Sequence, residues 1–520
     1  MLWQKESKKG NALYVDIMKS GGTDFELQDI LKELILSTNK NPLPKKCDSV
    51  SVQKRKEGNE YYAKQDWPNA MEKYNESLCF ATVGSKNISL AYANRASCFL
   101  QMKMYKKCLK DIEFAKEAGY PANLMTKLDQ RKANCLQYMN DGVQCNEFEA
   151  KLSFDPNQKF PCMANVLDVE EDINGNTTVV AKEDIMVGQV LVVERSFISV
   201  LFNRFGSKCN ICLKSLTNLM PCDGCAVAMF CSVECQKSVI HKYECGSKWC
   251  DHPLVNISLT REIRTTLSAI NIFSTAGEMM DFIEQTIQDK SKKLPENLAD
   301  NKSKYRAYLR QQSCVDCIKS SDYQINPIYD AILKIPKINE MFNSKKHRRF
   351  LMHLIAQHGL LGCHEPCCNS INQTGIVEGD EISMKSQINN AQSGLMATYF
   401  KHSTKPNMLS IRGDGISVGV AVRPIKKGEP ILNSCIPLRM DASLRQTSSA
   451  KRQQILSDPV YRYIYANHSY KQTFEDDKIR YILDKCISFL RKYGQFEWCA
   501  EVVFVMNIYG ELMRVRINSQ

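Results

Sequence analysis

The sequence predicts an α+β protein in which helical repeats precede a small β-rich core that carries a zinc-binding insertion, and helices follow at the end. Three observations support this class. Small and aromatic residues recur with a fixed period between about residues 50 and 140, short β-branched runs lie near 179–193 and 408–422, and eight possible metal ligands crowd residues 209–245. At 520 residues, the chain predicts roughly three or four domains.

The composition is that of an ordinary soluble globular protein, with 43% hydrophobic and 24% charged residues. The first ten residues show no signal-peptide pattern, and no uninterrupted apolar run is long enough to span a bilayer, so we expect no membrane association. The 23 cysteines then indicate a reducing compartment, where thiols stay free or bind metal. The net charge of +12 is a mild bias toward acidic partners.

The first predicted element is a helical repeat. Five small or aromatic residues are followed 38 residues later by small, aromatic or aliphatic ones: Gly58, Tyr61, Ala70, Tyr74 and Ser77, then Ala96, Phe99, Cys108, Ile112 and Ala115. Such residues let antiparallel helices pack closely and stack on the next pair, which is typical of tetratricopeptide repeats with a lengthened turn. A third repeat is predicted to begin near Pro121, and three repeats are about the minimum for a stable solenoid.

Five polar residues are predicted to share the concave face of these repeats: Arg55, Asn59, Asn94, Lys127 and Arg131. Two amides and three cations on one face would hold a peptide C-terminal carboxylate through charge-assisted hydrogen bonds. The set resembles the carboxylate clamp of tetratricopeptide domains that bind the acidic EEVD tails of cytosolic heat-shock chaperones. Arg55 stands where that family more often has Lys. The alternative is a merely polar groove on an ordinary scaffold.

The most specific chemistry in the sequence is a compact set of metal ligands. Two Cys-x-x-Cys pairs are followed by Cys-x3-Cys and His-x3-Cys, and the eight residues are Cys209, Cys212, Cys222, Cys225, Cys231, Cys235, His241 and Cys245. Each pair lets one turn aim two side chains at one ion, and tetrahedral zinc takes four such ligands. We therefore predict two structural zinc ions rather than buried free thiols, in a module of the size that normally binds proteins.

Two further clusters have competing explanations. Cys314, Cys317, Cys363, Cys367 and Cys368 either form another zinc site or are ordinary thiols, and we favour thiols because no fourth pair stands at a telling spacing. The basic run at 345–349 is either a nuclear-localisation or nucleic-acid patch or, as we favour, a solvated helix end. Because no aromatic platform accompanies it, nucleic acid is not an expected partner.

Strands and helices are predicted around the zinc ligands. Residues 179–185 and 190–194 predict two strands of a small hairpin, because short β-branched runs flank a glycine turn. Residues 252–360 predict mostly helices. Strands return on either side of a Gly-Asp-Gly turn within 408–422, and 475–515 predicts two helices with an apolar face.

In this order, these features resemble the SET- and MYND-domain family of protein-lysine methyltransferases. A strand pair, an eight-ligand zinc insertion and a helical stretch are followed by His-Ser-x-x-Pro-Asn at 402–407 and Ala-Val-Arg-Pro-Ile-x-x-Gly-Glu at 421–429. The repeats point to the subclass with N-terminal tetratricopeptide repeats. In this family the zinc ligands interleave, which implies two sets: Cys209, Cys212, Cys231 and Cys235 on one ion, and Cys222, Cys225, His241 and Cys245 on the other.

The resemblance implies a tetratricopeptide α-solenoid, a small split SET fold with an inserted two-zinc MYND finger, and C-terminal helices. The implied division is an N-terminal extension at 1–47, repeats at 48–145, the first SET part at 150–205, the MYND finger at 206–246, a helical insert at 247–355, the second SET part at 356–440, and a degenerate post-SET segment with helices at 441–520.

Family enzymes bind S-adenosylmethionine and hold a deprotonated lysine in line with its methyl group, so correctly placed groups matter. Here the Gly-x-Gly turn that would approach the cofactor reads Asn176-Thr177-Thr178. Lys401 replaces an Asn that contacts cofactor, whereas the knot-forming His402 and Asn407 remain.

Two more family features are altered. The active-site tyrosine falls at Cys435, unless the alignment slips by one or two residues. The ligands of the family's third zinc are replaced by Thr404, Tyr465, Asn467 and Tyr470, so we expect that zinc to be absent. Tyr461 and Tyr463 are either core aromatics, which we favour, or the wall of a lysine channel.

Two functions follow from the resemblance. The first, which the altered positions favour, is a scaffold or transcriptional co-regulator with a degenerate methyltransferase site. Its finger would bind proline-rich peptides, corepressors or histone deacetylases, and its repeats would bind chaperone tails. The second is an active S-adenosylmethionine-dependent protein-lysine (histone) methyltransferase. In either case we expect a zinc-binding monomer in the cytoplasm and the nucleus.

Overall fold

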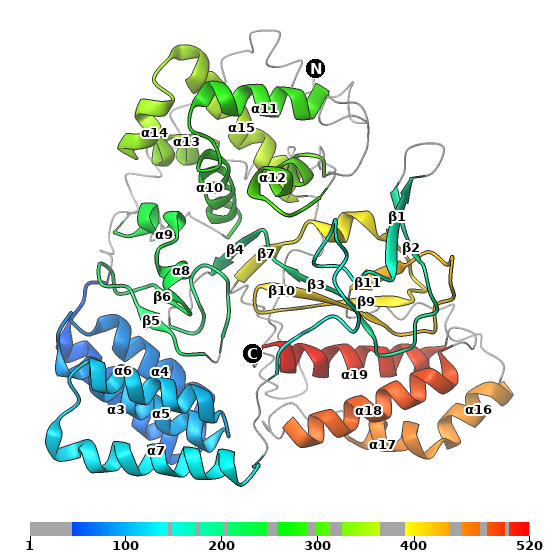
Figure 1. Ribbon diagram of the computed structural model, residues 1–520, viewed down its shortest axis with the longest axis horizontal. Coiled ribbons are helices and arrows are strands. Elements are labelled where there is room, and N and C mark those ends of the chain that lie inside the picture. The colour runs from blue at the N-terminus through cyan, green and yellow to red at the C-terminus, as the bar shows by residue number, and fades with distance from the viewer. Residues whose placement is uncertain are drawn as a thin grey trace, which may run out of the picture. The chain divides into compact units, whose positions relative to one another are not determined.

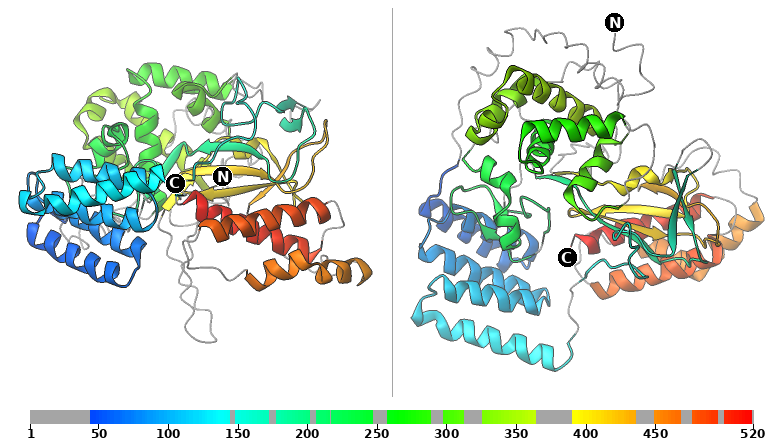
Figure 2. Two further views of the ribbon diagram at one scale, coloured as in Figure 1. Left: turned by 60° about the horizontal axis from the view of Figure 1, so that its bottom comes forward. Right: turned by 45° about the horizontal axis from the view of Figure 1, so that its top comes forward.

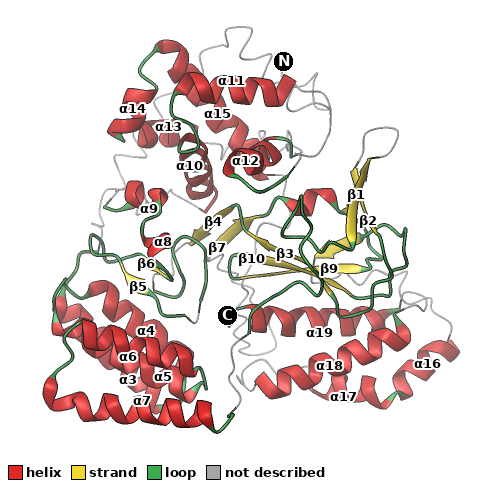
Figure 3. Cartoon of the chain, in the orientation of Figure 1, coloured by secondary structure: helices red, strands yellow, loops and turns green. Residues whose placement is uncertain are grey.

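A computed structural model of the chain describes residues 44–143, 148–171, 177–201, 206–215, 217–246, 257–288, 297–311, 325–363, 390–435, 449–467, 476–494 and 499–518 (Figure 1). The chain divides into two compact units. Unit 1 draws on Met1–Glu147, Ile198–Asp289 and Tyr308–Ser393, and unit 2 on Phe148–Phe197, Lys290–Ala307 and Gly394–Gln520. Both units contain helices and strands (Figure 3), so the mixed helix-and-sheet class is as predicted.

Unit 1 starts with two helix pairs and a fifth helix. They are α3 (Asp48–Ala63), α4 (Trp67–Phe80), α5 (Lys86–Gln101), α6 (Tyr105–Glu117), the 3-10 helix η2 (Ala122–Leu124) and α7 (Met125–Asn140). Both pairs repeat with the 38-residue period of the sequence, as the first residues of α3 and α5 and of α4 and α6 show. Asp66 and Ser85 accept backbone N–H groups at the starts of α4 and α5, which caps these helices.

Gly58 explains how α3 can pack closely on α4. A Cβ at this position would lie 2.5 Å from Cε1 of Tyr74, so only glycine leaves room for the ring. Tyr74 is buried, as are Ala70 of α4 and Ala96 of α5. The small and aromatic residues of the repeat therefore form one apolar cluster between the helices.

The remainder of unit 1 contains the zinc ligands, one strand pair and a group of helices. Strand β4 (Ile198–Leu201) pairs antiparallel with β7 (Asn390–Ser393). The helices are α10 (Ile257–Ile270), α11 (Ala276–Gln288), α13 (Ile325–Leu333), α14 (Pro336–Met341) and α15 (Lys345–Cys363). A further helix, α12 (Asn301–Leu309), begins in unit 2, and its last two residues belong to unit 1. The basic run at 345–349 forms the first turn of α15, where Lys345, Lys346 and Arg348 are exposed.

Unit 2 is built on a five-stranded sheet in the order β3-β10-β9-β11-β8. These strands are β3 (Val190–Arg195), β8 (Lys401–His402), β9 (Met408–Gly413), β10 (Ile416–Ala421) and β11 (Leu432–Cys435). β9 and β10 form the predicted hairpin, whereas β11 runs parallel to β9 and β8. A separate pair joins β1 (Leu167–Glu171) to β2 (Thr177–Ala181). The 3-10 helix η5 (Met396–Tyr399) precedes β8.

Four helices complete unit 2: α16 (Ser449–Ser457), α17 (Pro459–Asn467), α18 (Asp476–Tyr493) and α19 (Ala500–Ile517). α19 packs against β9 on one face of the sheet, and α18 packs against α19 (Figure 2). There Leu409 and Val418 share a buried cluster with Val503 and Met506. The apolar face predicted for α18 is buried as well. Across the described ranges, none of the helices combines the length and apolar character needed to span a membrane.

The predicted hairpin of 179–185 and 190–194 is wrong. β2 pairs with β1, and β3 pairs with β10, so the two runs are not partners. Between them, Ile185 bridges to Ile425, and the N–H of Gly188 donates to the carbonyl of Ala421. The β-branched runs correctly indicated strands, but β2 takes the strand that precedes it, and β3 takes a strand more than 200 positions away.

Buried polar groups anchor both units. In unit 2, the Glu194 carboxylate accepts backbone N–H groups of Leu395 at 2.6 Å and Met396 at 2.9 Å. Burial raises its pKa. In unit 1, Nδ1 of His358 on α15 lies 2.9 Å from the hydroxyl of Thr266 on α10, and burial lowers the pKa of His358 to about 3. Such groups hold neighbouring elements in one arrangement, because a buried polar atom without its partner is costly.

Candidate functional site

The eight candidate metal ligands form two groups of four. One contains Cys209, Cys212, Cys231 and Cys235, and the other contains Cys222, Cys225, His241 and Cys245. Within each group the ligand atoms lie within 4.8 Å of one another. This is the interleaved grouping that the resemblance implies. Among the described residues, no other cluster of three or more potential ligands occurs.

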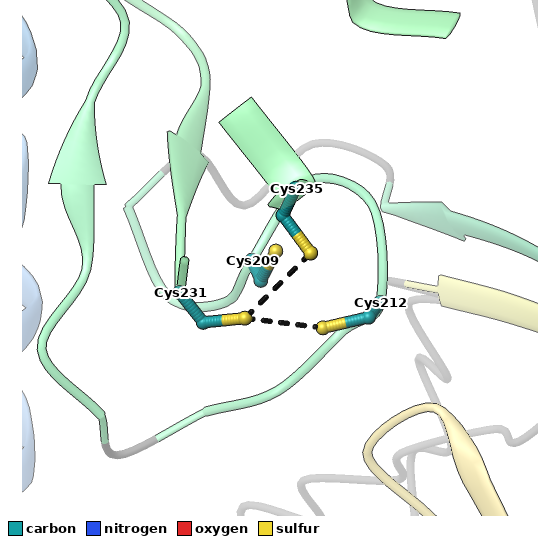
Figure 4. A group of neighbouring side chains, drawn as sticks. All are labelled: Cys209, Cys212, Cys231 and Cys235. Carbon is teal, nitrogen blue, oxygen red and sulfur yellow. Dashed lines mark hydrogen bonds between the residues drawn. The ribbon is translucent and has the colours of Figure 1, made fainter. Parts of the chain in front are cut away.

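The distances within each group suit tetrahedral zinc. Zn–S bonds of about 2.3 Å place two sulfurs about 3.8 Å apart. In the first group, Sγ of Cys231 lies 3.4 Å from that of Cys212 and 3.8 Å from that of Cys235 (Figure 4). In the second group, Nε2 of His241 lies 3.2 Å from Sγ of Cys222 and 3.9 Å from Sγ of Cys225. Both donor sets therefore fit a zinc ion.

Short elements bring these ligands together. Cys222 follows β5 (Met220–Pro221), and Cys231 follows β6 (Met229–Phe230), which pairs with β5. Cys235 lies on α8 (Val233–Gln236) and His241 on α9 (Val239–Glu244), which begin at the serine caps Ser232 and Ser238.

Packing and polarity fix the second ligand group further. The ring of Phe230 is buried edge-on against His241, with centroids 4.8 Å apart. Gly224 is required there, because a Cβ would lie 2.9 Å from Sγ of Cys245. The hydrogen bond with Cys225 lowers the pKa of Cys222, and the backbone N–H of Gly224 contributes in the same direction. Both effects favour the thiolate, which is the form that binds zinc.

A buried arginine fastens this module to the helices of unit 1. Arg95 of α5 is fully buried, and its Nε and Nη2 each donate to the Asp111 carboxylate of α6 at 2.7 Å. Its Nη1 donates to Oδ1 of Asn75 at 2.6 Å and to the carbonyl of Leu219, in the module, at 2.8 Å. Asn218 completes the arrangement by donating to Asp111 at 2.7 Å. The polar groups therefore satisfy one another across the contact.

A second buried arginine fastens the module to α10. Nε and Nη2 of Arg264 donate to the two carboxylate oxygens of Glu244 at 2.6 and 2.8 Å, and Nη1 donates to the carbonyls of Ser199 and Asn210 at 2.6 and 2.8 Å. Glu244 directly precedes the ligand Cys245. Sequence reasoning missed both arginines, although Arg95 stands among small and apolar residues in ANRASCF, which indicates a buried charge with a partner.

The residues of the predicted clamp lie on three helices: Arg55 and Asn59 on α3, Asn94 on α5, and Lys127 and Arg131 on α7. Oδ1 of Asn59 accepts from Nδ2 of Asn94 at 2.8 Å and from the hydroxyl of Tyr74 at 2.9 Å. Nη1 of Arg131 donates to the carbonyl of Ala93 at 2.7 Å. Hydrogen bonds thus join α3 to α5 and α5 to α7.

The other two clamp residues differ from each other. Nε of Arg55 is buried, and it has no hydrogen-bond partner in the described part of the chain. Lys127 is exposed. The face therefore combines the bonded amides of Asn59 and Asn94 with the partly buried guanidinium of Arg55 and the exposed side chain of Lys127.

The positions of the predicted cofactor site lie in unit 2. Thr178 stands within β2 opposite Glu170, and its hydroxyl is buried without a partner among the described residues. Asn176 lies outside the described residues. Lys401 and His402 form the exposed strand β8, and Cys435 ends β11, although its side chain lies outside the described set.

Asn407 has a structural role in the same region. Its Nδ2 donates to the carbonyl of Pro430 at 2.9 Å, and its Oδ1 accepts from the N–H of Leu432 at 2.8 Å. These bonds tie the segment after β8 to the segment that leads into β11.

Tyr463 is not a core residue, which corrects our preference. Tyr461 and Ile464 face the buried cluster, whereas Tyr463 is 38% exposed and packs edge-on against Tyr481. On a helix, residues two apart point in different directions, so Tyr461 and Tyr463 cannot share a face. Of the positions predicted to have lost the third zinc, Tyr470 lies outside the described residues, as do Cys314, Cys317, Cys367 and Cys368 of the further cysteine cluster.

The paired ligand groups, the short hairpin and the two small helices define a two-zinc finger of the MYND class, and the MYND finger family matches residues 209–245. The chain is also 27% identical over 229 residues to the protein-lysine N-methyltransferase SMYD4 of Danio rerio, and 27% identical over 264 residues to that of Homo sapiens. These matches support the resemblance of the chain to the SET and MYND domain-containing family.

The matches are partial. They cover 39% of this chain and 30% of the Danio rerio protein, and 37% of this chain and 33% of the human protein. The chain thus matches about a third of the length of these relatives. A shorter stretch of 80 residues is 39% identical to the mitochondrial import receptor subunit TOM34 of Rattus norvegicus, and it covers 15% of this chain and 24% of that protein.

Proposed function

We propose that this chain acts mainly as a zinc-dependent protein-interaction scaffold, or transcriptional co-regulator, with a degenerate methyltransferase site. One observation supports this most strongly. All eight finger ligands are present at zinc-binding distances, whereas the cofactor positions carry residues of different chemistry. In this proposal, α3–α7 are tetratricopeptide repeats, and the five-stranded sheet of unit 2 is the SET core.

The altered cofactor positions do not fit S-adenosylmethionine well. Thr178 occupies a regular antiparallel register with Glu170, at a place where the family uses glycine to let backbone approach the cofactor. Lys401 is exposed and carries only donors, whereas the Asn that it replaces offers both a donor and an acceptor. The residues at these positions therefore do not fit the cofactor.

The proposed ligands are peptides of two kinds. The finger would take proline-rich peptides, such as those of corepressors or histone deacetylases, and the concave face of the repeats would take an acidic C-terminal tail, such as that of a heat-shock chaperone. The bonded amides Asn59 and Asn94, the buried Nε of Arg55 and the exposed Lys127 support the second of these. Such a scaffold would work as a monomer in the cytoplasm and nucleus.

Fluorescence anisotropy with a synthetic peptide ending in Glu-Glu-Val-Asp tests the repeat face. We expect Lys127→Ala/Arg131→Ala to weaken binding by roughly 100-fold or more, because two charge-assisted hydrogen bonds worth about 1.5–3 kcal/mol each are lost. The matched control is Lys106→Ala/Lys110→Ala, which removes the same charge from exposed positions of α6. Equal affinity for the wild type and Lys127→Ala/Arg131→Ala would eliminate the clamp.

The second candidate is an active protein-lysine methyltransferase, which the names of the relatives favour. Calorimetry with S-adenosylmethionine or S-adenosylhomocysteine on the zinc-loaded chain separates the two functions. The scaffold predicts no measurable heat of binding. Tight binding of either compound would show that the cofactor pocket is intact, and the degenerate-site proposal would then be abandoned.

A further inference from the structure

Three consecutive residues of α5 contribute to two different surfaces. The carbonyl of Ala93 holds Arg131, and the amide of Asn94 is bonded to Asn59, so both belong to the concave face. The next residue, Arg95, points into the protein and is fully buried. Less than one helical turn therefore separates the proposed peptide-binding face from the contact with the finger.

The finger side of this contact is part of the helix core. Cys209, a ligand of the first group, lies in the same buried apolar cluster as the small and aromatic residues of α4, α5 and α6. Leu219 and Met229 of the finger belong to that cluster too. The ligand Cys212 packs against its edge. The first zinc group and the helices thus share one core, so the ligands cannot rearrange without disturbing the helix packing.

The hydrogen bonds between the finger and the helices also couple the finger to the helix packing. The carbonyl of Leu219 accepts from Arg95, and Leu219 leads directly into β5 and the ligand Cys222. On the other side, Nδ2 of Asn75 donates to the carbonyl of Gly206 at 2.7 Å. If the finger rearranged on losing zinc, the buried Arg95 side chain would lose an acceptor, and an unsatisfied buried donor is costly. The segment of α5 that contains Arg95 would have to move to find another.

We infer that zinc binding in the finger and peptide binding on the concave face of α3, α5 and α7 are linked through Arg95. Zinc holds Leu219 and Asn218 in place, these hold Arg95 and Asp111, and Arg95 sets the position of Ala93 and Asn94. The linkage rests on the proposed binding of an acidic C-terminus to this face. Because linkage is reciprocal, a bound peptide should raise the affinity for zinc by the same factor by which zinc raises the affinity for the peptide.

The test uses the full-length chain with and without zinc, which a chelator removes. A peptide ending in Glu-Glu-Val-Asp is the probe, and hydrogen exchange of the amides of α5 is a second readout that needs no peptide. We expect metal removal to lower the affinity of the chain for the peptide roughly tenfold, which is within the usual range of coupling between sites. We also expect faster exchange in α5, with α18 of unit 2 as the internal reference.

Two arginine variants separate the coupling from general loosening of the finger. Arg95→Lys cannot reproduce the four hydrogen bonds to Asp111, Asn75 and Leu219. We therefore expect this variant to have a lower affinity for the peptide even when zinc is bound. Arg264→Lys is the matched control, since it loosens the finger at α10, away from the concave face. Asn218→Ala is a milder change that removes the finger's hydrogen bonds to the Asp111 carboxylate and to the Lys107 carbonyl of α6. We expect an effect in the same direction as that of Arg95→Lys.

The outcomes distinguish the linkage from the clamp. If the zinc-loaded wild type fails to bind the peptide, the clamp is refuted. Hydrogen exchange in α5 with and without zinc then still shows whether zinc binding changes the stability of that helix. Unchanged exchange in α5 after metal removal would overturn the linkage. So would equal acceleration in α5 and α18, or a loss of peptide affinity in Arg264→Lys as large as that in Arg95→Lys.

Discussion

Replacing Gly58 by alanine tests whether close helix packing holds the repeat together. A Cβ there would lie 2.5 Å from Cε1 and 2.6 Å from Cδ1 of Tyr74. Overpacking of this kind costs about 1–3 kcal/mol, whereas alanine gains about 0.8–1 kcal/mol over glycine within a helix. Tyr74 is 2% exposed, and its hydroxyl donates to Asn59, so the ring is not free to move aside. The difference is a net loss of at most about 2 kcal/mol in the stability of α3 and α4, and we expect a value near this upper limit because the ring cannot move aside.

Native-state hydrogen exchange measures this quantity locally, which matters in a chain of two units. A loss of about 1.4 kcal/mol corresponds to tenfold faster exchange through local opening. The matched control is Gly277→Ala in α11, where the nearest atom to a new Cβ is 3.9 Å away, so only the helical gain should remain. The double variant Gly58→Ala/Tyr74→Leu should recover part of the loss. Unchanged or slower exchange of α3 and α4 in Gly58→Ala would refute the packing argument.

Three further predictions concern other buried groups. The folded-state pKa of His358 lies below that of the unfolded chain, so its contribution to stability is complete above about pH 6.5 and is lost as the pH falls toward 3. We expect a loss of about 1.6 kcal/mol between pH 6.5 and 5, measured by denaturation, and a flatter pH profile in His358→Gln. Glu194→Gln should cost about 0.5–1.5 kcal/mol in unit 2, because the carboxyl oxygen that accepts two backbone N–H groups is replaced, whereas Glu170→Gln at an exposed position should be neutral. Zinc release measured with a colorimetric chelator should give two equivalents for the wild type and for Cys486→Ser, and about one for Cys225→Ser; equal release from Cys225→Ser would contradict the second ligand group.

The metal site could be predicted from the sequence because its information is local. Pairs such as Cys209 and Cys212 are separated by a single turn, so their spacing alone indicates a shared ion. The helical repeat could also be predicted from the sequence, since its 38-residue period reflects the packing of each helix on its neighbours. Gly58 and Tyr74, for example, are followed 38 residues later by Ala96 and Ile112. In both cases the physical constraint acts between residues that are close in the chain.

Only the tertiary structure decided which distant residues become partners. The sequence correctly indicated strands at β2 and β3 but paired them with each other, because β-branched residues suit many partners. In the structure β2 pairs with the preceding strand β1, and β3 pairs with β10, far along the chain. Tyr463 was expected in the core until the helix phase placed it outside. Arg95 and Leu219 are 124 positions apart, and no spacing rule connects them. The amino-acid sequence by itself therefore determined the zinc ligands and the repeat, and the three-dimensional packing of remote segments determined what the finger is fastened to.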